Sequence, residues 1–180
     1  MSTFIRSICL LLFRLNCVDL PSWWPLHDQH LGMQTTIKAL RYAYLLPESM
    51  KASFDILERL GEKIPVTMND NNLVKDMQMM NETLRDMPDE LILGMAELTD
   101  KRTITLLKIY SNLIDVLYFI KPALICSISV RMIQLMLDKK ALCAVSPEAF
   151  SSYGEVLASH FGLIPEACRL GKCAYMSCFV

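Results

Sequence analysis

Glycine is scarce in this sequence, and neither sign of charge is in excess. Only 6 of 180 residues are glycine, whereas 53% are hydrophobic and 21% are charged. This composition argues against a disordered chain and indicates a packed core. Eighteen Lys and Arg residues against nineteen Asp and Glu residues leave a net charge of -1. Without a basic field to attract phosphates, we expect no nucleic-acid partner.

Short motifs that mark common catalytic sites are also missing. The chain contains no G-x-G-x-x-G, G-x-S-x-G or H-E-x-x-H. Its nearest approach to a phosphate-binding loop is Gly171-Lys172-Cys173, but Glu166 occupies the position of the required glycine. A thiol also stands where that loop uses a hydroxyl to bind magnesium. We therefore expect no enzyme activity, no bound nucleotide and no other cofactor.

The number and spacing of the cysteines predict free thiols. The seven residues are Cys9, Cys17, Cys126, Cys143, Cys168, Cys173 and Cys178. An odd number scattered through apolar segments is typical of small buried side chains in a reducing compartment such as the cytoplasm. The last three recur every five residues and would spread around a helix, whereas zinc ligands normally lie two to four residues apart. Structural thiols are therefore the favoured interpretation.

The three histidines lack the further ligands that a metal site needs. His27 and His30 flank Asp28, and His160 precedes the C-terminal cysteines. His27 and His30 lack a cluster of other ligands, so a solvated loop is the favoured interpretation of this pair, while a site from His160 with the C-terminal cysteines is conceivable but less favoured than structural thiols. We expect no metal site.

No apolar run is both long and free of charge, which argues against a membrane protein. Residues 8–13 form an apolar run of six residues that is short for a signal peptide and is followed by Arg14. Residues 113–130 are more apolar, but they include Asp115 and are split by Lys121-Pro122. A charge there costs about 3 kcal/mol in lipid. Two buried helices that meet at a proline are the better explanation.

Helix signals and apolar periodicity agree from residue 48 onward, whereas residues 1–47 specify no clear fold. The helix after Pro47 carries Met50, Phe54 and Leu57 on one stripe. In the next helix Leu73, Met77, Met80, Leu84 and Met87 repeat at spacings of four and three, and after Pro122 the inner stripe is Ile125, Ile128, Met132 and Leu135. The predicted helices span about 47–60, 70–87, a short turn from 88, 100–120, 122–138, 146–161 and 165–175, and no segment predicts a sheet. Asp70 or Asn71 is the predicted N-cap of the second helix, and Thr99-Asp100 supplies the cap and the N-terminal negative charge for the helix over 100–120.

Residues 146–175 have about the length of one tetratricopeptide-like unit. Its first helix starts at Ser146-Pro147-Glu148, which supplies a capping hydroxyl, a proline and an acid in the first turn. Small and aromatic residues at fixed spacing predict a close contact between its two helices; they are Phe150, Tyr153, Gly154 and Ala158 on the first and Ala167, Gly171 and Ala174 on the second. Outside this unit, Met79 falls off the inner stripe of its helix and is expected to face a partner.

Three segments resemble a known family: DILERLGEKIP (residues 55–65), LRDMPDELILGMAELTD (84–100) and SPEAFSSYGEVLASHFGLIPEACRLGKCA (146–174). They are similar to the helical, tetratricopeptide-like region of large multidomain signalling ATPases that combine an AAA/STAND-type ATPase with kinase, GAF or histidine-kinase modules. The resemblance covers about two thirds of the chain, departs from the family at residues 94–96 and does not include residues 1–47. It implies an architecture, and no catalytic residue can be carried over.

These observations predict an all-α protein of stacked antiparallel helical hairpins, a tetratricopeptide-like α-solenoid fragment. Residues 1–47 form an N-terminal segment and residues 48–180 form the helical domain. We expect a cytoplasmic, non-catalytic scaffold whose partner is another protein, another domain of a signalling protein, or a second copy. No charge follows Lys172, so the last hairpin should leave an apolar face open to a partner, unless the C-terminal tail folds back over it. Two alternatives remain: a fragment or paralogue that keeps ATPase activity, and a small membrane-associated helical protein.

Overall fold

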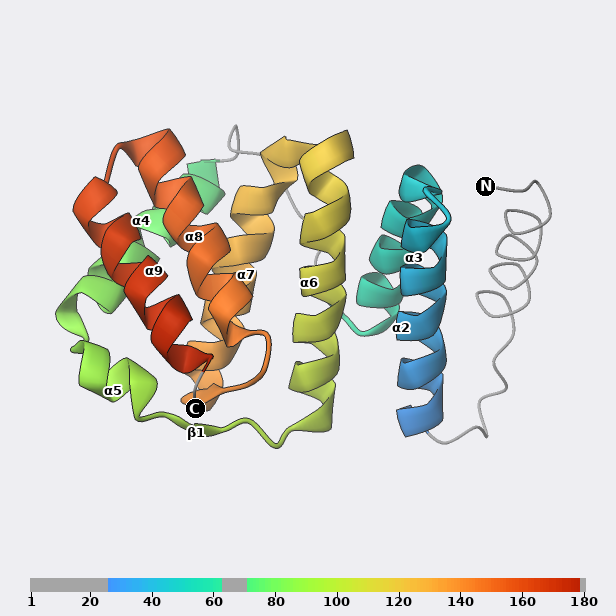
Figure 1. The fold of residues 1–180 in the computed structure, drawn as a ribbon, viewed down its shortest axis with the longest axis horizontal. Coiled ribbons are helices and arrows are strands. Elements are labelled where there is room, and N and C mark those ends of the chain that lie inside the picture. Colours follow the sequence, from blue (N-terminus) through green and yellow to red (C-terminus); the bar gives the residue numbers. More distant parts are fainter. Residues whose placement is uncertain (1–25, 63–70, 179–180) are drawn as a thin grey trace. The chain divides into compact units, whose positions relative to one another are not determined.

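The protein is predominantly helical, which confirms the predicted all-α class. A computed structural model describes residues 26–62 and 71–178 (Figure 1). Within those ranges eight α-helices alternate with short connections and two strands of two residues each. Their bounds are α2 Leu26–Tyr42, α3 Leu46–Arg59, α4 Asn71–Asp86, α5 Asp89–Leu93, β1 Ala96–Glu97, α6 Lys101–Ile120, the 3-10 turn η1 Pro122–Leu124, α7 Ile125–Lys139, β2 Ala141–Leu142, α8 Ser146–Phe161 and α9 Ile164–Ser177.

Helix α4 has the apolar stripe that its sequence predicts. Leu73, Met77, Met80 and Leu84 are all buried, because residues three and four apart lie on the same face of a helix. The predicted inner residues of α7 are buried as well. Of the two residues predicted to cap α4, Asp70 lies outside the described residues and Asn71 is the first residue of the helix.

The buried face of α3 differs from the predicted one. Met50 and Phe54 are half-buried, whereas Ser49 and Ser53 are fully buried. The Ser49 hydroxyl donates to the carbonyl of Ile37 in α2 at 3.2 Å, and the Ser53 hydroxyl donates to the carbonyl of Ser49 at 2.8 Å. Small hydroxyl side chains can turn inward because they hydrogen-bond to nearby carbonyls. Leu57, the third residue predicted for this stripe, is buried, so the predicted stripe overlaps the buried face of α3 only in part.

A short parallel pairing of β1 with β2 was not predicted. Ala96 aligns with Ala141 and Glu97 with Leu142, and the N–H of Leu98 donates to the carbonyl of Leu142 at 2.7 Å. Two residues are too few to show the alternation of a strand in the sequence. The pairing joins the connection before α6 to the connection after α7.

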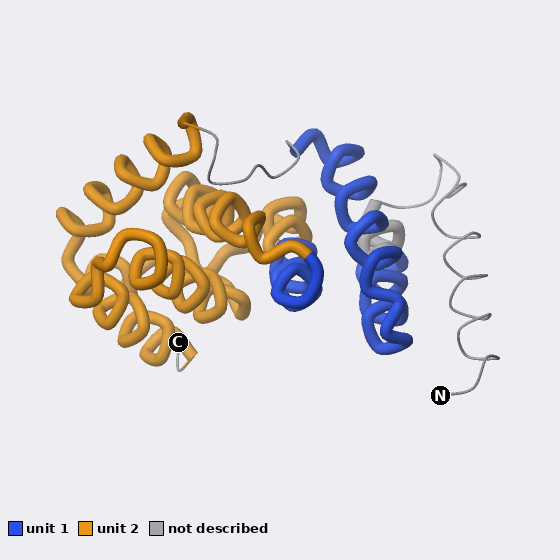
Figure 2. Tube along the Cα trace, turned by 90° about the horizontal axis from the view of Figure 1, so that it is seen from above, with its two compact units in different colours: residues 1–64, 108–120 blue, residues 65–107, 121–180 orange. Residues whose placement is uncertain are grey.

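The chain forms two compact units, which Figure 2 shows in different colours. The first comprises residues 1–64 and 108–120, and the second comprises residues 65–107 and 121–180. Helix α6 contributes its first third to the second unit and the remainder to the first. The boundary predicted between residues 47 and 48 falls at the start of α3, inside the first unit.

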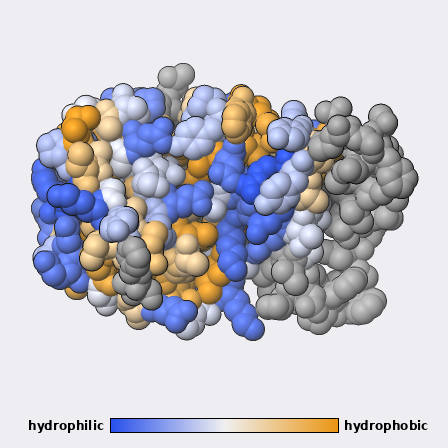
Figure 3. Space-filling view, viewed as in Figure 1, coloured by the Kyte–Doolittle hydropathy of each residue, from blue (hydrophilic) through white to orange (hydrophobic). Residues whose placement is uncertain are grey.

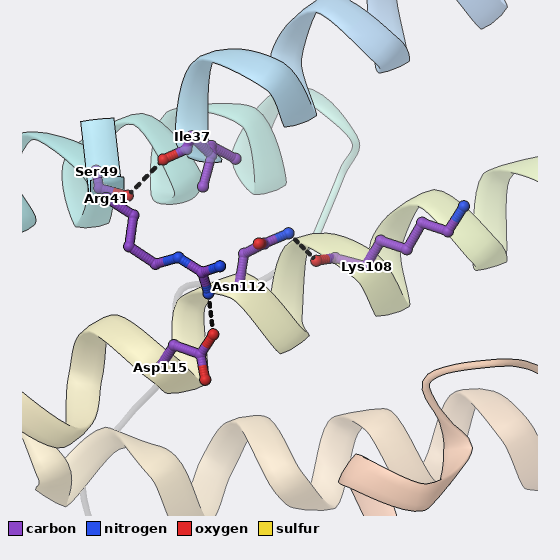
Figure 4. A network of polar contacts seen from close by, with 6 residues as sticks. All are labelled: Ile37, Arg41, Ser49, Lys108, Asn112 and Asp115. Carbon is purple, nitrogen blue, oxygen red and sulfur yellow. Dashed lines mark hydrogen bonds and ion pairs between the residues drawn. The ribbon is translucent and has the colours of Figure 1, made fainter. Parts of the chain in front are cut away.

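In the first unit, a polar contact joins α2 to α6 (Figure 4). The guanidinium of Arg41 donates to the carboxylate of Asp115. Beside it, the side-chain amide of Asn112 donates to the carbonyl of Lys108 at 2.7 Å. Asp115, the acidic residue within the apolar sequence of α6, therefore pairs with an arginine from α2, a helix that lies far away in the sequence.

Asp100 caps the N-terminus of α6, as its sequence predicts. Its carboxylate accepts the backbone N–H of Thr103 at 3.3 Å and also the Thr103 hydroxyl. Lys139 lies 3.4 Å from the same carboxylate. The hydrogen bond from Thr103 is the main reason that the pKa of Asp100 lies below its ordinary value of 3.8, and burial opposes this shift. A negative charge here also interacts favourably with the helix dipole.

The Asp100→Ala variant is expected to lose about 1 kcal/mol of unfolding free energy at neutral pH, because one helix cap is removed. Asp100→Asn should lose less, because the amide oxygen still accepts the N–H bond. Because the folded pKa is depressed, the wild-type advantage over Asp100→Asn exists above the unfolded pKa and disappears as the pH falls through the folded one. Urea unfolding at neutral and acid pH measures both effects; a constant difference at all pH values would contradict the cap.

Candidate interaction surface

The two C-terminal helices form a tight antiparallel hairpin in the second unit. Gly162 ends α8 with φ of 66°, a left-handed conformation that favours glycine, and Pro165 lies in the first turn of α9. At the other end, the predicted capping role of Ser146 is wrong. Its hydroxyl accepts the N–H of Cys143 in the preceding turn at 2.8 Å and makes no cap hydrogen bond to α8.

Helices α8 and α9 approach most closely at Gly154. A Cβ atom built on this residue would lie 3.2 Å from the carbonyl oxygen of Ala167 and 3.6 Å from the Cβ of Leu170. The first distance is tighter than ordinary van der Waals contact. The absence of a side chain therefore lets the two helix backbones meet, as the sequence predicts for this position.

Tyr153 and Phe150 fill the space beside this contact. Both are buried, with 0% and 1% of their surface exposed. The Tyr153 hydroxyl donates to the carbonyl of Met77 in α4 at 3.0 Å, which satisfies a polar group that is otherwise costly to bury. Burial raises the pKa of this hydroxyl above its ordinary value of 10.0. Tyr153 therefore fixes α8 against α4 and stays neutral.

Arg169 connects α9 to the end of α4 and to α5. Its Nε donates to the carboxylate of Asp89 at 2.5 Å and its Nη1 to the carbonyl of Leu84 at 2.7 Å, while its Nη2 donates to the carbonyl of Met87. The last carbonyls of a helix have no partner within the helix. The guanidinium supplies one, and so it acts as a C-terminal cap from another element.

The Arg169→Ala variant is expected to lose about 2 kcal/mol of stability, within the range for hydrogen bonds that involve a charged group. Arg169→Lys should recover part of the loss, because an ammonium keeps the charge but lacks the planar fork of donors. Urea denaturation of both variants gives the difference. Equal losses for Lys and Ala would show that the fork geometry is unimportant.

The solvent-facing side of α9 is unusually poor in charge. We call its exposed residues the outer arc; they are Ile164, Pro165, Cys168, Gly171, Lys172, Tyr175 and Met176, together with Cys178 after the helix. Lys172 is the one charged member. Figure 3 shows tan and orange residues interspersed with white and blue ones over the region where α9 lies in Figure 1. A solvent-facing helix normally places charged and polar residues on this side.

Helix α4, in the same unit, provides the contrast. Its exposed residues are Asn71, Asn72, Lys75, Asp76, Gln78, Met79, Glu82, Thr83, Arg85 and Asp86. All but Met79 are polar or charged. The apolar character of the outer arc is therefore a property of α9 and does not extend to every surface helix of the unit.

The predicted interaction residues separate into buried and exposed sets. Phe150, Tyr153, Gly154 and Ala174 are buried, and Ala158 and Ala167 are half-buried. Gly171 is exposed, and a Cβ atom there would meet no heavy atom within 4 Å. The prediction that Gly171 lies at the contact between α8 and α9 is therefore wrong, because this residue is on the opposite side of α9. Met79 is 65% exposed and lies among polar residues.

The described thiols do not converge on a common site. All five described cysteines are free; Cys168 and Cys178 are exposed, whereas Cys126 and Cys173 are buried. Burial is the main cause of the raised pKa of Cys173, with a further contribution from Asp89, so the reactive thiolate is disfavoured. No group of three His, Cys, Asp or Glu residues in the described ranges could hold a metal ion. The predictions at Cys9 and Cys17 fall outside the described residues. His27 and His30 lie within α2, so the loop predicted for this pair is wrong.

One described helix, α6, is long and apolar enough to cross a membrane, and 61% of its apolar window is buried inside the protein. A mostly buried core helix passes the same test.

Comparisons with protein-family models, curated proteins and solved structures found no match. The assignment of a function therefore rests on the residues and contacts described above.

Sequence reasoning missed Arg169 and Lys172. Arg169 sits within the C-terminal helix without any local pattern that distinguishes it from a solvated arginine, and its partners are more than 80 residues away in the chain. The signal at Lys172 was available, because it is the last charged residue of the sequence. The structure places Lys172 among uncharged residues on the exposed side of α9, an arrangement that the sequence alone did not indicate.

Proposed function

We propose that this protein is a non-catalytic helical scaffold that contacts other proteins, or other domains of a signalling protein, through the outer arc of α9. The observation that carries the proposal is the presence of one charged residue, Lys172, on that whole exposed surface. Ile164, Tyr175 and Met176 are 55%, 66% and 51% exposed. Contiguous exposed apolar residues of this kind mark interaction sites on soluble proteins.

The architecture we propose is a tetratricopeptide-like stack of antiparallel hairpins, as in the signalling ATPases that the sequence resembles. Contacts between α7 and α8 and between α8 and α9 support it. In such arrays each hairpin buries its apolar face against a neighbour, and the outer arc is where a further hairpin would stack. Helices α4 and α5 also contact α7 and α9, so the second unit is more compact than an array with nearest-neighbour contacts alone.

Of the two other candidate functions, neither has a comparable observation in its favour. Retained ATPase activity would need a phosphate-binding loop, and the sequence has none. Association with a membrane would use the apolar run of residues 8–13, which lies outside the described residues, or α6, whose apolar window is mostly buried. We place the scaffold in the cytoplasm, where the free thiols would remain reduced.

A photo-crosslinking amino acid tests the scaffold in cells. Placed at Gly171, in the middle of the outer arc, it is expected to form covalent adducts with protein. The matched control is Gln78 on α4, which is exposed but surrounded by polar residues. Equal adduct formation at the two positions would contradict a specific role for the outer arc. Binding of ATP to the purified chain would instead support the ATPase alternative.

A further inference from the structure

We propose that the outer arc of α9 binds the same surface of a second copy of this chain, with the two helices antiparallel. The inference rests on the proposed function, because it names the partner of that same surface. It starts from one row within the arc. Ile164, Cys168, Gly171 and Tyr175 are exposed and follow one another at spacings of four, three and four, which places them in line along a helix.

This row is complementary to itself when one copy is reversed. Ile164 and Tyr175 lie equally far from the midpoint of the row, and so do Cys168 and Gly171. Two antiparallel copies related by a two-fold axis therefore place Ile164 against Tyr175 and Cys168 against Gly171. Such an interface uses the same patch on both partners.

The sizes of these residues fit a helix crossing. Cys168 and Gly171 at the centre are small, and the open space around Gly171 leaves room for another backbone. Two helices approach closely where small residues meet, and they separate on either side of the crossing. Ile164 and Tyr175 are large and sit where the helices diverge. At each end of the helix pair, Ile164 of one copy would therefore meet Tyr175 of the other.

The charge of the arc favours a second copy over a polar partner. The row itself has no charge, and Lys172 beside it can extend its ammonium into solvent while its stem covers apolar surface. A charged partner would lose its hydration without gaining a compensating charge. A suitable partner surface must therefore carry little charge. The outer arc of a second copy meets this condition, whereas the exposed side of α4 does not.

The expected dimer is weak. One helix pair buries less than the roughly 1,200 Å² of total surface that stable protein interfaces usually reach. We therefore expect reversible association that increases across the micromolar range. Sedimentation velocity of the full chain at increasing concentration measures it; a monomer throughout that range would overturn the proposal.

Gly171→Glu tests the location of the interface. The added side chain has space in the monomer and should not disturb folding, but it would bury an uncompensated charge in the dimer. We expect dimerisation to weaken by about tenfold or more. Gln78→Glu on α4 adds the same charge at an exposed polar position and should leave dimerisation unchanged. Equal effects of the two substitutions would place the interface elsewhere.

Disulfide trapping tests the antiparallel arrangement. We use a background in which Cys9, Cys17, Cys143, Cys168 and Cys178 are replaced by serine. A mixture of Ile164→Cys and Tyr175→Cys chains should form a mixed disulfide dimer under mild oxidation, whereas Ile164→Cys alone should not. Preferential dimerisation of Ile164→Cys alone would indicate parallel helices and overturn the arrangement.

The two proposals fail in different ways. If the chain stays monomeric but the photo-crosslinker at Gly171 still captures another protein, the second copy is the wrong partner and the scaffold stands. If neither association nor crosslinking occurs, the outer arc is not an interaction surface, and both proposals are wrong.

Discussion

The Tyr153→Ala variant is expected to lose about 3–5 kcal/mol of unfolding free energy, the range for removing a large aromatic side chain from a core. Tyr153 has no exposed surface, so truncation leaves a cavity at the contact of α8 with α4. The loss is a large fraction of the 5–15 kcal/mol that stabilises a typical domain. Urea denaturation followed by circular dichroism measures it.

Tyr153→Phe separates the hydroxyl from the ring. It keeps the packing but removes the hydrogen bond to the carbonyl of Met77, and it should cost about 1 kcal/mol. A loss as large as that of the alanine variant would mean that the hydrogen bond, and not the packing, fixes α8. A negligible loss for alanine would show that Tyr153 is not part of a close-packed core.

Gly154→Leu is expected to destabilise the protein by about 3 kcal/mol, the upper part of the usual range for overpacking. The first atom of the new side chain would already lie 3.2 Å from the carbonyl oxygen of Ala167, and backbone cannot move aside as a flexible side chain can. The hairpin would have to separate to accommodate the rest of the leucine. The shift in melting temperature relative to the wild type is the measurement.

Two substitutions on α9 are the matched controls. Gly171→Ala adds a methyl group where no atom lies within 4 Å, so it should stabilise the helix by about 0.5–1 kcal/mol through its better propensity. Cys168→Ser, at an exposed position, should change stability by less than about 0.5 kcal/mol. If Gly154→Leu were no worse than Cys168→Ser, the close contact of α8 with α9 would be wrong.

Much of the helical organisation could be predicted from local sequence. The stripe of α4 and the breaks near Gly162 and Pro165 depend on residues within a few positions of each other, because helix periodicity and capping act over one or two turns. The same local reasoning placed the acid that caps α6 at Asp100. It failed at Ser49 and Ser53, where hydroxyl groups turn into the protein and bond to carbonyls.

The candidate surface was predicted in part. An uncharged C-terminal segment is visible in the sequence, and so is the tight contact at Gly154. The sequence could not distinguish Gly154 from Gly171, because both are small residues within helices. The packing of α8 against one side of α9 makes the first glycine a contact and leaves the second in solvent.

The sequence by itself therefore determined the helical class, most helix boundaries and the lack of a nucleotide-binding motif, because these depend on neighbouring residues. Tertiary packing decided which side of each helix is covered. It also brought Arg169 to Asp89 and Tyr153 to Met77, pairs separated by 80 and 76 residues. The burial of apolar surface that drives such packing is non-directional. An apolar stripe therefore predicts that a helix face is buried, but it does not identify the element that packs against this face, because that depends on the fold of the whole chain.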